Sequence, residues 1–151
     1  CDLSKCFDTI DRNILLKRME NIGVRSDALK WFTSYLSNRM QVVSVDDYSS
    51  QEKEINYDVI QGGTLSATLF LIYINALPLN LPKHKTYLFA DDTSVLVTGD
   101  TWEKVFSEGQ DALDVIGNWF SQSILTLNTK KTKYMLIGCT NESSNIGDLN
   151  L

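Results

Sequence analysis

One stretch decides the fold of this chain, and it reads Tyr87-Leu88-Phe89-Ala90-Asp91-Asp92-Thr93-Ser94-Val95-Leu96-Val97. Apolar and β-branched residues stand on both sides of the acids Asp91 and Asp92, which predicts a strand, a tight turn and a second strand, with the acids at the turn. Two neighbouring carboxylates repel each other, and removing them from water is costly unless cations hold them. The stretch therefore favours a divalent-metal platform at a hairpin tip, although Asp-Asp is also common in ordinary turns.

A third acid strengthens the metal interpretation. Asp2 stands at the end of a short apparent strand, and the aromatic Phe7 follows it. Asp2 is far from Asp91 and Asp92 in the sequence, but neighbouring strands of one sheet could bring the three carboxylates together at one end of that sheet. Three carboxylates can hold two Mg²⁺ ions, because Mg²⁺ prefers oxygen ligands and keeps part of its water shell for phosphates. Taken alone, Asp2 would be a solvated acid at a strand end.

The composition limits the class of protein. With 151 residues and 43% apolar content, the chain can bury one core, and we expect one domain. It does not begin with Met, so we expect a fragment of a larger protein. The net charge of -5 disfavours free-standing nucleic-acid binding, which normally needs a basic surface, unless the acids gather around metals and the basic surface lies in flanking segments.

The histidine and cysteine pattern disfavours zinc and disulfides. The sequence has one histidine, His84, and Cys1, Cys6 and Cys139 have no metal-ligand spacing, so we expect neither a zinc site nor a disulfide framework. This pattern fits an intracellular, reducing location, either cytoplasmic or nuclear. The most apolar run, residues 69–74, is too short to span a bilayer, so we expect no membrane partner.

Hydrophobic periodicity and turn residues predict alternating helices and strands. One expected helix begins at an Asp11 cap and ends at Gly23, and a second begins at Ser26 or Asp27 and ends near Asn38. A third runs from Gly63 to about Leu77, and a fourth covers residues 102–123. Besides the acidic hairpin, the expected strands are 41–45 paired with 54–59, and the short segments 125–127 and 134–137. Strands interleaved with helices that cover one face indicate an α+β layer.

Two of these motifs together resemble a known family. The run Asp2-Leu3-Ser4-Lys5 with Phe7-Asp8-Thr9, and the run Phe89-Ala90-Asp91-Asp92, resemble the palm of reverse transcriptases, most of all those of non-LTR (LINE-type) retrotransposons. The resemblance implies an α+β fold of the polymerase right-hand palm type, a split βαβ (ferredoxin-like) arrangement with helices packed on one face of an antiparallel sheet. Residues 1–138 would be the palm, lacking most of the fingers and all of the thumb, and 139–151 a flexible tail or the start of the next segment.

The resemblance implies an RNA-directed DNA polymerase that adds dNMP to a primer 3′-hydroxyl with two Mg²⁺ ions, for which Mn²⁺ could substitute. The implied partners are an RNA template, a DNA primer, dNTP, and the flanking fingers and thumb of the same polyprotein. We expect the fragment alone to be inactive, because it lacks the parts that hold primer and template. Two alternatives remain open, namely a decayed, inactive palm and a group II intron maturase-type reverse transcriptase.

The resemblance also assigns roles to single residues. Asp2, Asp91 and Asp92 would be the catalytic metal ligands, and Lys131, in the motif from Leu125 to Met135, would be a catalytic cation near the departing pyrophosphate. A solvated basic turn is an equally good interpretation of Lys131. The resemblance also implies that substrate is bound by Leu3, Phe7, Gln61 and Gly62. Phe7 would lie beside the sugar of the incoming nucleotide.

The stretch from Asp58 to Leu71 resembles the template-grip and substrate-pocket motif of the family, but it departs from that motif at several positions. Where the family usually has Gly, Pro, Ser and Gly-Pro, this chain has Asp58, Ile60, Gly63, Ser66 and Ala67. These departures are the best support for the decayed-palm alternative.

Overall fold

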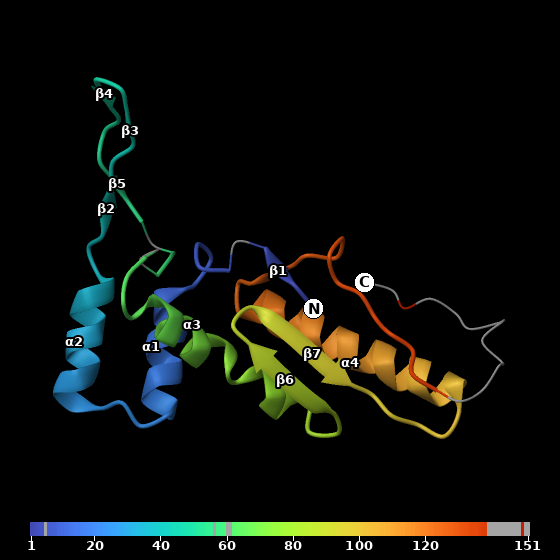
Figure 1. Cartoon of the computed structure of the whole chain (residues 1–151). Coiled ribbons are helices and arrows are strands. Elements are labelled where there is room, and N and C mark those ends of the chain that lie inside the picture. The colour runs from blue at the N-terminus through green and yellow to red at the C-terminus, as the bar shows by residue number, and fades with distance from the viewer. Residues whose placement is uncertain (5, 56, 60–61, 139–148, 150–151) are drawn as a thin grey trace. The chain divides into compact units, whose positions relative to one another are not determined.

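The computed structural model describes residues 1–4, 6–55, 57–59, 62–138 and 149 (Figure 1). They form two compact units, which we call the hairpin unit (Cys1–Cys6 with Asn75–Leu151) and the helical unit (Phe7–Ile74). Mixed helices and small antiparallel strands confirm the α+β class. The predicted tail, 139–151, lies outside the described residues apart from Leu149, and none of the described helices is long and apolar enough to cross a membrane.

The hairpin unit is built on the predicted acidic hairpin. Strands β6 (Lys85–Phe89) and β7 (Asp92–Leu96) are antiparallel, with Phe89 opposite Asp92. This register leaves Ala90 and Asp91 as a two-residue loop. Ala90 has a φ of +51°, because so short a loop requires a residue with positive φ. The acids therefore lie at the turn, as the sequence predicted.

A short strand from the N-terminal segment joins this unit. Strand β1 (Leu3–Ser4) is antiparallel to β8 (Thr126–Leu127), and the backbones of Cys1 and Thr93 exchange two hydrogen bonds, at 2.6 and 3.1 Å. The N-terminal segment therefore lies between β7 and β8. This placement brings Asp2 beside the acidic hairpin, although more than eighty residues separate them in the sequence.

The core of the hairpin unit lies along α4 (Trp102–Gln122), which begins at a Thr101 cap. Its buried residues recur every three or four positions, as expected for an amphipathic helix, and they are Gly109, Ala112, Ile116, Trp119 and Phe120. The 3₁₀ turn η1 (Leu77–Asn80) packs against this helix. The strand predicted at 134–137 is wrong, because an alternating pattern becomes a strand only where a second strand pairs with it, and no described strand does.

The helical unit is built on three helices, α1 (Arg12–Asn21), α2 (Ser26–Leu36) and α3 (Ser66–Ile74). The predicted Asp11 cap is confirmed, because an Asp11 carboxylate oxygen accepts a hydrogen bond from the Ile14 N–H at 2.9 Å. Helix α1 packs against both other helices. The largest fully buried side chains of the unit are Ile10, Leu15, Met19, Leu36, Val59, Leu69, Phe70, Tyr73 and Ile74.

Helices α2 and α3 have boundaries that differ from the prediction, and α3 begins at Ser66 where the sequence predicted a start after Gly63. The residue before α2 is Arg25, and both Ser26 and Asp27 lie inside the helix, so neither forms the cap. Helix α3 ends at Ile74, and the apolar run continues as η1, which contains Pro78 in its first turn. Proline is tolerated there because the first-turn N–H would have no helical partner in any case.

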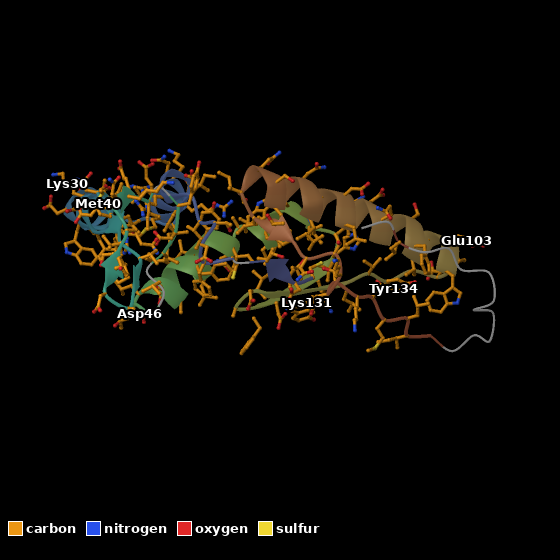
Figure 2. All side chains as sticks on the ribbon, turned by 90° about the horizontal axis from the view of Figure 1, so that it is seen from above. Lys30, Met40, Asp46, Glu103, Lys131 and Tyr134 are labelled. Atoms are coloured by element: carbon orange, nitrogen blue, oxygen red, sulfur yellow. The ribbon has the colours of Figure 1, made fainter. Side chains whose placement is uncertain are left out.

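A two-stranded ribbon leaves the helical unit after α2. Strand β2 (Met40–Gln41) pairs with β5 (Lys53–Glu54), and β3 (Ser44–Val45) pairs with β4 (Tyr48–Ser49). The side chains of these four strands are exposed, and Figure 2 labels Met40 at the start of the ribbon. The predicted return strand at 54–59 is therefore wrong beyond Glu54. Residues 57–59 instead run along 7–11, where Val59 N–H donates to the Phe7 carbonyl at 3.1 Å.

Candidate metal and nucleotide site

The backbone of Asp2 is held from two sides. Its carbonyl accepts a hydrogen bond from the Asn128 N–H at 2.9 Å, and its own N–H donates to the Thr132 hydroxyl at 3.4 Å. The preceding residue, Cys1, is bonded to Thr93 of β7, and the following residue, Leu3, pairs with Leu127 of β8. Asp2 is therefore fixed in position by its neighbours before any ligand binds.

The carboxylate of Asp2 has one unsatisfied oxygen. The side chain is 24% exposed, and its Oδ2 atom is buried with no hydrogen-bond partner. The ammonium of Lys131 lies 3.8 Å from Oδ2, on a side chain that is 70% exposed and is labelled in Figure 2. A contact of this length with an exposed lysine stabilises the carboxylate little. A buried carboxylate oxygen without a donor is the kind of atom that can ligate a cation.

The other two acids lie at the hairpin tip. Asp91 is half-buried in the loop and Asp92 is exposed at the start of β7, and neither forms an ion pair with a described lysine or arginine. Thr93, the residue after Asp92, donates its N–H to the carbonyl of Cys1, the residue before Asp2, at 3.1 Å. Asp2 and Asp92 therefore flank one pair of hydrogen-bonded residues.

The described residues contain no group of three or more His, Cys, Asp or Glu side chains placed to hold a metal ion. The three aspartates thus do not form a closed three-ligand cluster by themselves. The structure brings together the segment of Asp2 and the start of β7, because the neighbours of the two acids, Cys1 and Thr93, are hydrogen-bonded to each other.

Two residues that hold Asp2, Asn128 and Thr132, were not predicted from the sequence. The Thr132 hydroxyl accepts from the Asp2 N–H and donates to the Asn128 carbonyl at 2.9 Å, and the N–H groups of Lys131 and Thr132 donate to the same carbonyl at 3.1 and 2.9 Å. Residues 128–132 therefore form a turn that places Lys131 beside Asp2. The turn was visible in the sequence as polar residues, but its long-range bond to Asp2 was not.

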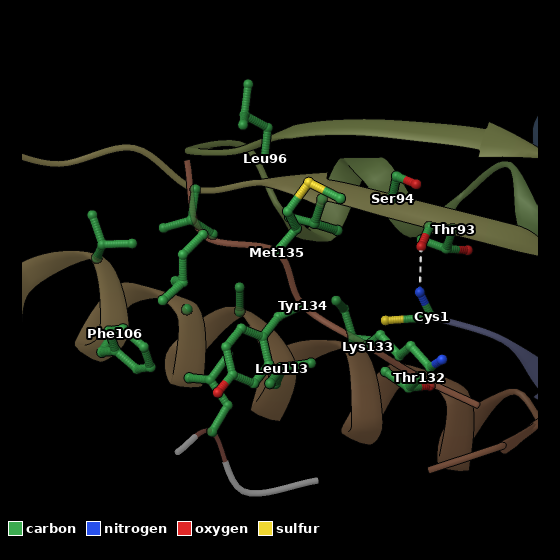
Figure 3. Close-up of a pocket in the computed structure, with 18 residues that line it drawn as sticks. Cys1, Thr93, Ser94, Leu96, Phe106, Leu113, Thr132, Lys133, Tyr134 and Met135 are labelled. Carbon is green, nitrogen blue, oxygen red and sulfur yellow. Dashed lines mark hydrogen bonds between the residues drawn. The ribbon is translucent and has the colours of Figure 1, made fainter. Parts of the chain in front are cut away.

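A cavity of about 330 Å³ lies next to this region, between β7, α4 and residues 132–136 (Figure 3). Cys1 and Thr93 stand at one end of it, joined by the dashed hydrogen bond in the picture. Its wall is mostly apolar, and none of the three aspartates lines it. The cavity is therefore distinct from the candidate metal site.

The predicted substrate contacts are divided between the units. Leu3 belongs to the hairpin unit, and its side chain is buried there. Phe7 belongs to the helical unit, where its ring lies 5.0 Å from that of Phe70 at an interplanar angle of 36°. Gly62 has a φ of +76°, which favours glycine, and a Cβ added there would meet open space. Gln61 lies outside the described residues.

Comparison with known proteins gives two matches. The family described as "Reverse transcriptase (RNA-dependent DNA polymerase)" matches residues 1–147 of the chain. The RNA-directed DNA polymerase from the mobile element jockey of Drosophila melanogaster is 30% identical over 105 residues, which cover 65% of this chain and 12% of that protein. The chain thus matches only a small part of the length of this relative.

Proposed function

This chain belongs to the reverse transcriptase (RNA-dependent DNA polymerase) family, and we propose that it forms the palm of an RNA-directed DNA polymerase. The predicted family is confirmed, and the match to a mobile-element enzyme agrees with the resemblance to LINE-type elements. Residues 1–138 would be the palm, of the split βαβ type. Its partners would be an RNA template, a DNA primer and dNTP, together with fingers and thumb from the same polyprotein.

One observation carries this proposal. Asp2 Oδ2 is a buried carboxylate oxygen with no hydrogen-bond donor, and the preceding residue, Cys1, is hydrogen-bonded to Thr93 of the strand that Asp92 begins. Carboxylate oxygens are the ligands that Mg²⁺ prefers, so the residues present fit the metal that the family implies. Because the aspartates alone do not form a closed cluster, oxygens of the bound triphosphate would complete the coordination.

In this proposal Asp2, Asp91 and Asp92 hold two Mg²⁺ ions, or Mn²⁺ in their place. When bound, the ions would lower the pKa of the primer 3′-hydroxyl and neutralise the triphosphate and the leaving pyrophosphate. Asn128 and Thr132 already hold the backbone of Asp2, so its carboxylate would not need to move during the reaction.

Lys131 has a separate role in the proposal. Its ammonium lies near the Asp2 carboxylate and is exposed, so it is free to approach an anionic group that binds beside the metals. There it would stabilise the charge of the departing pyrophosphate or donate a proton to it. Leu3, whose side chain is buried, would contact substrate through its backbone, and Gln61 and Gly62 would contact template or nucleotide.

The test is primer extension by the full-length protein that contains this chain. Asp2→Asn should lower dNMP incorporation by a factor on the order of a hundred or more, the cost of removing one group that stabilises charge in a transition state. Asp100→Asn is the matched control, because the Asp100 side chain is 97% exposed and its one ion pair among the described residues is with Lys104 at 4.0 Å, so it should leave incorporation unchanged.

The same assay tests the decayed-palm alternative. This chain naturally has Asp58, Gly63 and Ser66 where the family motif usually has other residues, and these departures favour that alternative. An unmodified full-length protein that binds primer and template but incorporates no nucleotide would support the decayed palm and contradict an active polymerase. Equal incorporation by the unmodified protein and Asp2→Asn would remove Asp2 from the metal site.

A further inference from the structure

Asp58 has a backbone conformation that side-chain-bearing residues rarely adopt. Its φ is +144°, a region that glycine enters freely and in which other residues are strained. Such strain persists only where the surrounding contacts outweigh it. The contacts of Asp58 should therefore explain why an aspartate occupies this position.

Two arginines share the Asp58 carboxylate. Arg12 Nη2 donates to Oδ1 at 2.8 Å, and Arg39 Nη2 lies 3.7 Å from Oδ2. The side chains of Arg12, Arg39 and Asp58 are only 11%, 24% and 18% exposed, so water screens the three charges weakly. We call these three residues the Asp58 ion cluster. Charge-assisted hydrogen bonds of this kind are about twice as strong as neutral ones.

The Asp58 carboxylate is also the counter-charge for both arginines. The Nε atoms of Arg12 and Arg39 are buried without hydrogen-bond partners. No other described acid forms an ion pair with either guanidinium. Replacement of Asp58 by glycine would relieve the backbone strain, but it would leave two partly buried positive charges beside each other without a counter-charge.

The ion cluster joins three segments of the helical unit. Arg12 is the first residue of α1, and Arg39 precedes the ribbon, where its carbonyl accepts from the Ile55 N–H at 2.9 Å. Asp58 N–H donates to the Ile10 carbonyl at 3.1 Å, and Val59 N–H donates to the Phe7 carbonyl at 3.1 Å. Asp58 and Val59 are thereby fixed to the backbones of Ile10 and Phe7.

We infer that Asp58 is a positioning residue for the nucleotide pocket. Held by Arg12 and Arg39, it keeps its own N–H on the Ile10 carbonyl and the Val59 N–H on the Phe7 carbonyl. This inference rests on the proposed function, because that function makes Phe7 and Gly62 contacts of the incoming nucleotide. It also gives a physical reason for aspartate in place of glycine: the ion cluster supplies the order that a flexible glycine would lack.

Three substitutions separate the ion cluster from the backbone strain. Asp58→Asn keeps the shape and a hydrogen-bond acceptor, Asp58→Gly removes both the cluster and the strain, and Asp58→Ala removes the cluster and keeps the strain. In primer extension by the full-length protein, Asp58→Gly should raise the KM for dNTP about tenfold or more, as expected for loss of a hydrogen bond between charged groups. The effect on kcat should be smaller, Asp58→Ala should be worse than Asp58→Gly, and Asp58→Asn should be the mildest. A KM for Asp58→Gly equal to or below that of the unmodified protein would overturn the inference.

A second measurement does not require activity. Amide hydrogen exchange of Val59 reports directly on its bond to the Phe7 carbonyl. Exchange at Val59 should accelerate by about tenfold or more in Asp58→Gly, and it should stay unchanged in the control Asp27→Asn, which removes the carboxylate of the exposed pair with Lys30. Unchanged exchange at Val59 in Asp58→Gly would overturn the inference even if the protein proves to be a polymerase. Accelerated exchange in a protein without polymerase activity would contradict the proposed function alone.

A milder variant covers the case in which Asp58 variants do not fold. Arg39→Met removes the longer of the two contacts and leaves the bond between Arg12 and Asp58 in place. It should accelerate exchange at Val59 less than Asp58→Gly does, yet measurably. No acceleration in Arg39→Met, with Asp58→Gly unfolded, would show that Asp58 is structural without positioning this segment, and the inference would then be wrong.

Discussion

At the scale of a single residue, two observations on Phe7 support different assignments. Its ring packs against Phe70, as a core residue would, while it is only half-buried and leaves part of its surface open to a nucleotide. In the full-length protein, Phe7→Ala should admit ribonucleotides in primer extension while dNTP use stays measurable, because a ring beside the sugar would collide with a 2′-hydroxyl. Phe7→Tyr keeps the ring and should keep the discrimination. Loss of thermal stability without loss of discrimination in Phe7→Ala would assign Phe7 to the core alone.

At the scale of an element, helix α3 offers a matched pair of leucines. Leu69 is 2% exposed and Leu71 is 46% exposed, on the same helix. Leu69→Ala should lower the free energy of unfolding by about 2–5 kcal/mol, through lost burial and the cavity left behind. Leu71→Ala should change it by roughly 0.5 kcal/mol or less. Denaturant melts of the two variants measure the difference, and equal losses would contradict the placement of α3 in the core.

Elements were predictable where their signals are local. The Asp11 cap, the amphipathic period of α4 and the acidic hairpin depend on residues close together in the sequence, and all three were predicted. The partner of residues 57–59 was not, because pairing with residues 7–11 is a long-range contact. The candidate site divides in the same way. Asp91 and Asp92 follow from the turn, whereas the support of Asp2 by Thr132 requires the fold.

At the scale of the whole molecule, the net charge of -5 raises the electrostatic repulsion among the carboxylates and favours the binding of cations. Mg²⁺ that binds only the folded state stabilises it by mass action, by about 1.4 kcal/mol at ten times Kd. The melting temperature should therefore be higher in millimolar Mg²⁺ or Mn²⁺ than in KCl of the same ionic strength. Asp91→Asn should reduce this rise and should itself raise stability without metal, because it removes one of two adjacent like charges.

The control for the metal experiment is Asp100→Asn, which lowers the negative charge by the same amount at a 97% exposed side chain beyond the end of β7. It should leave the metal-dependent rise intact. A lower melting temperature of Asp91→Asn in the absence of metal would instead identify Asp91 as a structural hydrogen-bond acceptor, and the catalytic assignment would lose its physical support.

The hydroxyl of Thr132 has a consequence for how copies of this gene should be compared. It is a donor to Asn128 and an acceptor for Asp2 at once, so serine is the one replacement that preserves both bonds. Valine has the same shape but would leave the Asp2 N–H without its partner. In an alignment of sister copies, position 132 should therefore vary only between threonine and serine among intact genes. Any other residue there would mark a copy under relaxed selection, even one in which all three aspartates persist.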